Sequence, residues 1–172
     1  MLKSTLGIAI AFSLCAVAHA ANQGQGVVNF KGTVIDAPCG IAPESADQTI
    51  DFGQISKSLL TAGGISKAQD LDIKLVNCDT SKSKVTKGVT LTFSGNTVNG
   101  VATELETAGP TNTAIVINGY GSDITFGQPT DNIKLTNGDN TLRFQSWVKQ
   151  ASTKTAAEGD FTAVANFNLA YE

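Results

Sequence analysis

The stretch of sequence that decides the fold lies between residues 28 and 39. It reads Val28-Asn29-Phe30-Lys31-Gly32-Thr33-Val34-Ile35-Asp36-Ala37-Pro38-Cys39. Up to residue 34 its even positions are apolar or glycine, and up to residue 33 its odd positions are polar. This period of two predicts a strand over residues 27–35 with one apolar face. Pro38 has no backbone N–H to donate, so we expect the strand to end before Cys39.

The residues at the start of the chain have the three parts of a signal peptide. Lys3 supplies a positive charge, residues 6–17 form an uncharged apolar run, and Ala18-His19-Ala20 is a small-x-small cleavage site. The apolar run is too short for a stable membrane anchor; the alternative interpretation is a buried N-terminal helix. We predict a signal peptide over residues 1–20, cleaved between Ala20 and Ala21. The mature chain then has 172 − 20 = 152 residues and no histidine, because His19 is the only one.

Cleavage also removes Cys15 and leaves Cys39 and Cys78 as the only cysteines. An exported protein meets an oxidising compartment, in which such a pair is typically bonded. We therefore predict a Cys39–Cys78 disulfide, which closes a loop of about 39 residues. The chain-entropy model gives such a bond roughly 4 kcal/mol of stabilisation. The alternative is two free buried thiols.

Charge and histidine content exclude several classes of function. The whole chain carries 12 Lys+Arg against 15 Asp+Glu, which argues against a nucleic-acid-binding surface. Without histidine, the mature chain assembles neither a Ser-His-Asp triad nor an imidazole-ligated metal site; only carboxylate chemistry stays open. Asp70 and Asp72 share a strand face as calcium ligands do, but Lys74 stands where a third acceptor is needed. We expect no catalytic residues, no cofactor and no metal.

The rest of the chain has the pattern of short strands separated by turns. Strands are expected at residues 49–52, 71–75, 89–93, 114–117, 142–148 and 161–171, because apolar residues alternate or cluster there. Asn-Gly pairs at residues 99–100, 118–119 and 137–138 are the strongest turn signals, since both residue types tolerate positive φ. Seven or more short strands with one disulfide predict a single all-β domain, an immunoglobulin-like β-sandwich.

Two interpretations of the strand over residues 27–35 remain open. It is either an ordinary first strand of the sandwich or a strand meant for another molecule. It precedes the first mature cysteine and follows a polar, Gly-rich segment, Ala21-Asn22-Gln23-Gly24-Gln25-Gly26. A segment of that composition is expected to be mobile by itself.

Taken together, these residues closely resemble the major pilin subunits of chaperone–usher fimbriae, of the type 1 and P pilus kind. The resemblance covers nearly the whole mature chain. It rests on residues 28–39, Phe52-Gly53, Val76-Asn77-Cys78, Gly159, and Tyr171 as the penultimate residue. Each of these signals is weak alone, and the ordered set is specific.

The resemblance implies a sandwich that lacks its final strand and exposes an apolar groove. In such pilins a periplasmic chaperone lends a strand to the groove, and at an outer-membrane usher the N-terminal extension of the next subunit replaces it. Residues 21–38 would be this extension and residues 39–172 the pilin domain. The donor strand would insert the face formed by Val28, Phe30, Gly32 and Val34.

The resemblance also implies partners and a location. The chaperone would pair with the C-terminal strand, whose residues of interest are Gly159, Phe161, Ala163, Ala165, Phe167, Leu169 and Tyr171. The product would be a homopolymer of identical subunits, joined to minor pilins or a tip adhesin. This fimbria would reach the bacterial cell surface through the periplasm and support adhesion.

Other functions have less support in these residues. A carbohydrate-binding adhesin of this family would carry an extra N-terminal domain, for which residues 21–38 are too short. A receptor contact through Tyr120 or Trp147 stays open, with packing or loop cover as the favoured role of both residues. An enzyme is the third interpretation. Minor adaptor pilins share the same motifs, so the motifs leave the position in the fibre open.

Overall fold

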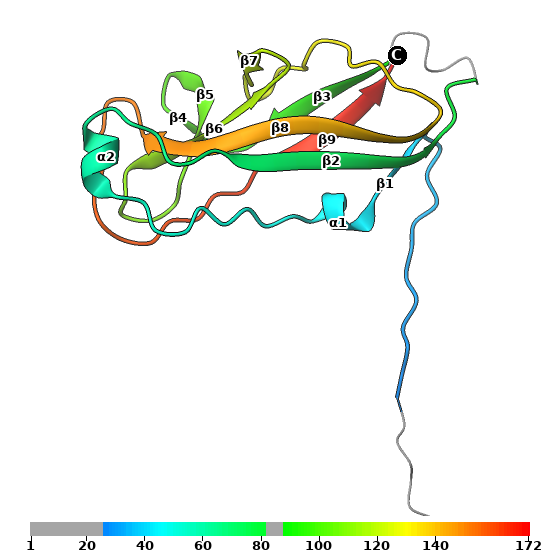
Figure 1. Cartoon of the computed structure of the whole chain (residues 1–172), viewed down its shortest axis with the longest axis horizontal. Helices are drawn as coiled ribbons and strands as arrows, with labels where there is room; N and C mark the ends of the chain where they lie inside the picture. Colours follow the sequence, from blue (N-terminus) through cyan, green and yellow to red (C-terminus); the bar gives the residue numbers. More distant parts are fainter. Residues whose placement is uncertain (1–25, 82–87) are drawn as a thin grey trace, which may run out of the picture. The chain divides into compact units, whose positions relative to one another are not determined.

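The computed structural model describes residues 26–81 and 88–172 (Figure 1). Residues 35–172 form one compact unit, and the described residues 26–34 belong to a separate unit. The predicted signal peptide, its Ala20–Ala21 cleavage site and residues 21–25 lie outside the described residues. Among the residues that are described, no helix combines the length and the hydropathy that crossing a membrane requires.

The compact unit consists mainly of strands. Its elements in chain order are β1 (Gly40–Ile41), α1 (Pro43–Ala46), α2 (Lys57–Thr61), β2 (Gln69–Cys78), β3 (Val89–Ser94), β4 (Thr97–Val98), β5 (Val101–Glu106), β6 (Thr113–Gly119), β7 (Ser122–Asp123), β8 (Gly138–Gln150) and β9 (Asn166–Tyr171). The expectation of an all-β domain is thereby confirmed, with two short helices that the sequence did not predict.

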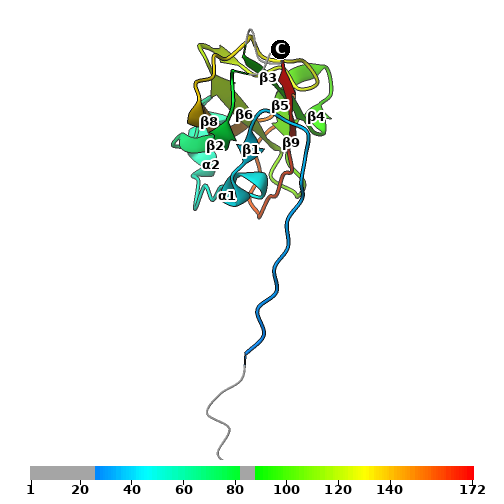
Figure 2. The same ribbon diagram turned by 90° about the vertical axis from the view of Figure 1, so that its right-hand side faces the viewer.

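The strands form two antiparallel sheets. The larger sheet has the order β1-β2-β8-β6-β5-β4, with β7 paired to β6, and the smaller sheet pairs β3 with β9. Figure 2 shows β2 and β8 in one layer and β3 and β9 in the other. The long β2–β8 ladder sets Leu71 beside Phe144 and Ile73 beside Leu142. Because side chains alternate along a strand, this register turns all four of them toward the second sheet.

The core lies between the two sheets. Ile73, Leu75, Leu142 and Phe144 of the larger sheet pack against the apolar face of β3, and all of them are buried. The rings of Phe93 and Phe144 meet edge to face at 5.2 Å between centroids. This arrangement is favourable for aromatic pairs, and it links the centres of the two layers.

The predicted disulfide is confirmed. Cys39 and Cys78 are bonded and buried, so the residue before β1 is joined to the end of β2. Asp79 N donates to Pro38 O at 2.9 Å beside it. The bond therefore ties the start of the compact unit to its longest ladder.

Several expected strands are confirmed and others are wrong. The predictions at residues 71–75, 89–93, 114–117 and 142–148 fall within β2, β3, β6 and β8. The strand predicted at residues 161–171 forms only from Asn166, as β9, and residues 49–52 form no strand. Residues 26–35 likewise have no strand hydrogen bonds. A period of two predicts which side chains share a face, but a strand also needs a neighbouring backbone.

The turn predictions were partly right. Asn99-Gly100 joins β4 to β5, as expected. In the β6–β7 hairpin, however, Gly119 pairs with Ser122, so the turn is made by Tyr120 and Gly121, both at positive φ. A Cβ on Gly119 would overlap the Phe144 ring. Gly119 is therefore needed for packing, and the turn lies one step further along the chain.

Candidate functional site

The inward face of β9 is less buried than the strand beside it. In the register of the smaller sheet, Leu91 of β3 lies opposite Leu169 of β9, and Phe93 lies opposite Phe167. The β3 members of these pairs are buried, whereas their β9 partners are only half-buried. The same half-burial extends to the other residues of this face: Phe161, Ala163, Ala165 and Tyr171. Among residues 26–81 and 88–172, none covers this face fully.

The outer edge of β9 also lacks a partner. Within the described part of the chain, β9 pairs only with β3. β3, in contrast, is flanked on its other side by residues 127–133, for example through Val89 N donating to Ile133 O at 2.9 Å. A row of backbone donors and acceptors along β9 is therefore open to an added strand.

The segment that follows β1, up to Ile55, forms a second apolar wall opposite the one formed by residues 161–171. Ala42 N donates to Lys74 O at 3.0 Å, next to the two-residue pairing of β1 with β2. Pro43 then begins α1, and residues 47–55 make no backbone–backbone hydrogen bond with any described residue. Ile50, Phe52 and Ile55 are half-buried on this wall. The strand predicted at residues 49–52 did not form because no described backbone pairs with this segment.

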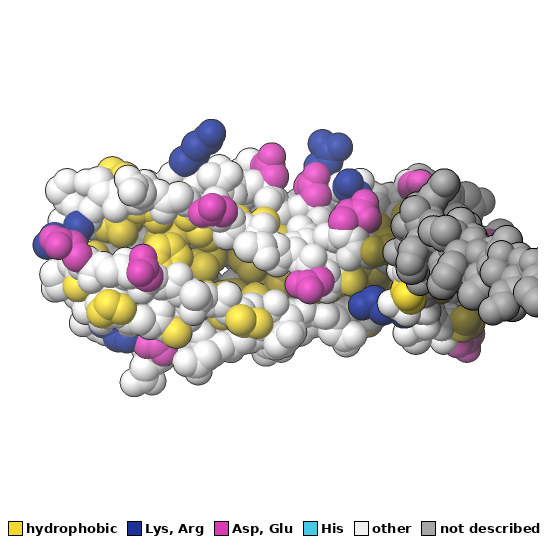
Figure 3. Space-filling view, turned by 90° about the horizontal axis from the view of Figure 1, so that it is seen from below, with side chains coloured by type: hydrophobic (Ala, Val, Ile, Leu, Met, Phe, Trp, Pro, Cys, Tyr) yellow, Lys and Arg dark blue, Asp and Glu magenta, His cyan; other side chains and the backbone are white. Residues whose placement is uncertain are grey.

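Between the two walls is a strip of hydrophobic side chains. Figure 3 shows this strip as a hollow bordered by polar and charged groups. We call it the groove, and define it by Ile50, Phe52 and Ile55 on one wall and by Phe161, Ala163, Ala165, Phe167, Leu169 and Tyr171 on the other. An open apolar strip of this kind marks an interaction site on a soluble domain.

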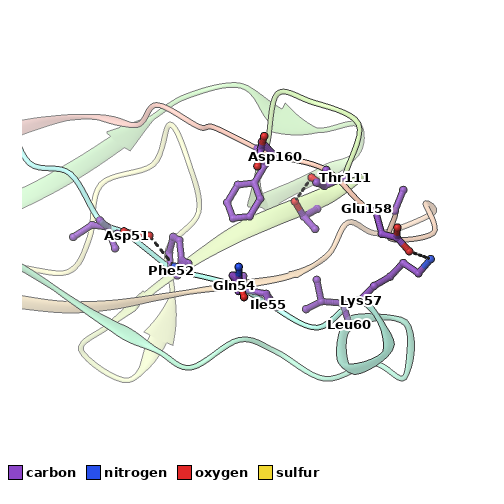
Figure 4. Close-up of a pocket in the computed structure, with 15 residues that line it drawn as sticks. Asp51, Phe52, Gln54, Ile55, Lys57, Leu60, Thr111, Glu158 and Asp160 are labelled. Carbon is purple, nitrogen blue, oxygen red and sulfur yellow. Dashed lines mark hydrogen bonds and ion pairs between the residues drawn. The ribbon is translucent and has the colours of Figure 1, made fainter.

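One end of the groove deepens into a pocket of about 520 Å³ (Figure 4). The rings of Phe52 and Phe161 approach across it to 6.4 Å between centroids. Lys57 Nζ and Glu158 Oε1 form an ion pair of 2.8 Å that joins the two sides. The Lys57 hydrogen bond and charge hold the pKa of the Glu158 carboxyl below its usual value. No motif in the sequence pointed to Ile50, Ile55, Lys57 or Glu158, although Phe52 belongs to the Phe52-Gly53 motif.

Gly159 sets the shape of the wall beside this pocket. Its φ is 139°, and a Cβ there would lie 2.5 Å from Pro110 Cγ. Only glycine adopts this conformation readily and leaves room for the proline. The residue predicted to matter near the C-terminus therefore positions Phe161 and the residues that follow it.

The predicted donor residues lie in the other unit and are exposed. Phe30 is 93% exposed and Val28 is 73% exposed, and Val34 is fully exposed. An added Cβ on Gly32 would meet no atom within 4 Å. Residues 26–34, here called the arm, thus combine an apolar face with unpaired backbone. The arm offers an extended apolar strand that has no partner. The groove offers an apolar surface and an open strand edge that have no partner.

The remaining candidate residues are placed elsewhere. Tyr120 packs edge to face on Phe144 at 5.5 Å between centroids, and Trp147 is half-buried. Asp70 accepts a hydrogen bond from Gln145 Nε2 at 3.3 Å. No cluster of three metal-ligating side chains occurs among residues 26–81 and 88–172. The groove is therefore suited to binding an extended strand.

Comparisons with known proteins agree with this arrangement. A family model described as "Fimbrial protein" matches residues 28–172. The Pap fimbrial major pilin protein of Escherichia coli is 49% identical over 185 residues, covering 100% of both chains. Fimbria A protein of Serratia marcescens is 44% identical, covering 99% of this chain and 98% of that protein.

Solved structures of pilus subunits are also similar to this chain. A chain in the structure of a chaperone–usher pilus superimposes with a TM-score of 0.81 at 52% identity, covering 87% of this chain and 97% of that one. The P pilus rod subunit PapA superimposes with a TM-score of 0.75 at 49% identity, covering 79% and 100%. These matches confirm the immunoglobulin-like sandwich that the sequence predicted.

Proposed function

The chain belongs to the fimbrial protein family, and from that premise we propose that its arm fills the groove of a neighbouring copy. The protein is a structural subunit of a cell-surface fimbria and not an enzyme. Subunits of this kind polymerise by donor-strand exchange, so each completes the sandwich of another.

One observation carries the assignment of the exchanged parts. The half-buried face of β9 and the exposed face of the arm are both apolar and both lack a partner. An extended segment placed along β9 would satisfy its open backbone edge and cover the groove at the same time. A single copy provides one arm and one groove, which is the arrangement that an open chain of identical subunits requires.

The magnitudes are sufficient for a stable fibre. Burial of Val28, Phe30 and Val34 contributes roughly 1.5–3 kcal/mol each. Backbone hydrogen bonds along β9 add about 0.5–1.5 kcal/mol apiece. Gly32 falls on the same face, and its lack of a side chain permits a close approach of the two backbones. We assign residues 21–38 to the extension and residues 39–172 to the pilin domain.

Before assembly the groove needs a temporary cover, because an open apolar groove and a free edge promote aggregation. We assign this role to a periplasmic chaperone that pairs with residues 159–171 and is displaced at an outer-membrane usher. Gly159 supports this assignment by shaping the wall, and Phe161, Ala163, Ala165, Phe167, Leu169 and Tyr171 supply the contact face. Residues 1–20 serve as the export signal.

Its relatives suggest the position of the subunit in the fibre. The Pap fimbrial major pilin protein and the PapA rod subunit are each matched at 49% identity. We place this chain in the rod, as the repeated subunit that joins identical copies. Minor pilins or a tip adhesin would then be joined to the end of the rod and mediate adhesion.

The deciding experiment compares two neighbouring residues of the arm. Phe30→Asp puts a carboxylate on the inserting face, where burial of an unpaired charge costs several kcal/mol. Asn29→Asp puts the same group on the opposite face. We expect Phe30→Asp to abolish fibres while the subunit is still recovered with its chaperone, and Asn29→Asp to assemble normally. Fibres are counted by electron microscopy, and the chaperone complex is measured by co-purification.

Two results would contradict the proposal. Normal fibres from Phe30→Asp would show that the arm is not the inserted strand. Loss of the chaperone complex in Phe30→Asp would indicate that Phe30 belongs to the subunit's own core.

A further inference from the structure

The pocket at the end of the groove has an acidic rim. Three carboxylates line it, those of Asp51, Glu158 and Asp160, together with the ammonium of Lys57. Glu158 is paired with Lys57, which leaves two carboxylates uncompensated. Neither Asp51 nor Asp160 forms an ion pair with a described residue. Figure 3 shows acidic side chains on both sides of the hydrophobic strip.

The two uncompensated carboxylates come from opposite walls. Asp51 precedes Phe52 on one wall, and Asp160 precedes Phe161 on the other. In Figure 4 the two residues lie on the two chain segments that border the pocket. Asp51 Oδ1 also accepts a hydrogen bond from Gly53 N at 2.8 Å, which holds its carboxylate at the rim. We expect a strand that lies in this end of the groove to pass between them.

The arm carries a single charge. Among residues 26–34 only Lys31 is ionised at neutral pH. It lies between Phe30 and Gly32, so a strand that inserts those two residues turns Lys31 away from the groove floor. Its long stem can lie along either wall while the ammonium reaches the rim.

We propose that Lys31 of one copy contacts Asp51 and Asp160 of the next copy's groove and thereby selects the register in which the arm enters. This inference rests on the function proposed above. A slip of one residue would turn the ammonium into the apolar floor. A slip of two residues would carry it about 7 Å along the groove, away from the two carboxylates. Only one register satisfies both the apolar face and the charge.

The contact also guides association. Opposite charges on arm and groove raise the rate of encounter, and salt screens that attraction. An exposed ion pair contributes little to final stability. The charge therefore affects mainly the rate and the register of strand entry. Burial of the apolar face determines the stability of the bound strand.

The test uses charge exchange within the full mature subunit, because every copy carries both arm and rim. Lys31→Glu should slow assembly about threefold to tenfold at low salt, and the difference should shrink at high salt. Adding Asp51→Lys and Asp160→Lys to the Lys31→Glu chain should restore the rate. Lys31→Arg, which keeps the charge, should assemble normally, as should Lys67→Glu, which changes an exposed lysine outside the groove. Assembly is followed by light scattering and fibre length.

Each outcome decides the inference. Wild-type assembly of Lys31→Glu at low salt overturns it, as does a defect that persists at high salt or is not repaired by the rim exchange. Because Lys31 lies outside the compact unit, its variants do not depend on refolding of the groove. If the rim variants lose the chaperone while Lys31→Glu assembles normally, the rim serves the chaperone and the inference is wrong. Normal fibres from Phe30→Asp would instead overturn the proposed function itself.

Discussion

At the scale of single residues, Glu104 is a charged side chain that the described fold buries. It lies in β5 and is 3% exposed. Lys149 Nζ donates to its Oε1 at 2.6 Å, and Ser152 donates to it through N at 2.9 Å and through Oγ at 2.7 Å. Burial alone would raise the pKa of Glu104, but the hydrogen bonds from Lys149 and Ser152 and the Lys149 charge outweigh it and lower that pKa. The carboxylate is therefore part of the folded structure in its charged form.

We expect Glu104→Gln to destabilise the subunit by about 1–3 kcal/mol at pH 7, because it leaves the Lys149 ammonium without its counter-charge. The lowered pKa gives the pH dependence. Stability from Glu104 is complete above the ordinary pKa of 4.5 and is lost as pH falls through the lower folded value. The gap between wild type and variant should therefore close on acidification. Urea midpoints at several pH values measure it.

Glu106 is the matched control for this experiment. It is on the same strand and pairs with Lys154, but its side chain is 29% exposed. Glu106→Gln should change stability by less than about 1 kcal/mol. Equal losses from the two variants, or a gap that widens in acid, would contradict the argument.

At the scale of elements, the β3–β9 pair contrasts two leucines that lie opposite each other. Leu91 is fully buried in the single chain, and Leu169 is half-buried at the edge of the groove. Leu91→Ala should cost about 2–5 kcal/mol in the unassembled subunit. Leu169→Ala should cost about 1–2 kcal/mol there, since less apolar surface is lost.

The difference in stability cost between Leu91→Ala and Leu169→Ala should disappear in the fibre. Once a neighbouring strand covers the groove, Leu169 becomes a core residue, and its truncation should weaken the fibre as strongly as that of Leu91. Urea unfolding of the unassembled subunit and thermal dissociation of fibres measure the two states. A Leu169→Ala fibre as stable as the wild type would mean that the groove stays open after assembly.

At the scale of the whole molecule, the arm and the compact unit should be separable. Deletion of residues 21–31 should leave the urea midpoint of the subunit nearly unchanged, because Val28 and Phe30 are exposed in the single chain. Such a subunit still has a groove but no arm to donate. Mixed with wild-type protein, it should stop growth at one end and shorten the fibres seen by electron microscopy. Unfolding on deletion, or fibres of normal length, would contradict this division.

The local features of this protein could be predicted from its sequence. Alternation of apolar and polar residues predicted β2, β3 and β8, and the same signal predicted which arm residues share a face. The cysteine count after cleavage predicted the Cys39–Cys78 bond. The strand predictions succeed because alternation depends only on residues that are close in the chain. The disulfide prediction succeeds because the two cysteines have no third cysteine to pair with after cleavage. The ordered motifs then indicated the pilin family.

Which strand edge stays open could not be predicted from the sequence and is seen only in the folded chain. Phe52 and Phe161 carry the same kind of apolar signal as Leu71 or Phe93, yet they border an uncovered groove. Lys57 and Glu158 stand 101 residues apart and meet only because the two walls end at the same pocket. Whether an apolar strand face is buried depends on a backbone supplied from elsewhere in the fold, and no periodicity within the segment records it. For residues 47–55 and the outer edge of β9, no described residue supplies that backbone. An alternating pattern therefore yielded a binding surface there instead of a closed core.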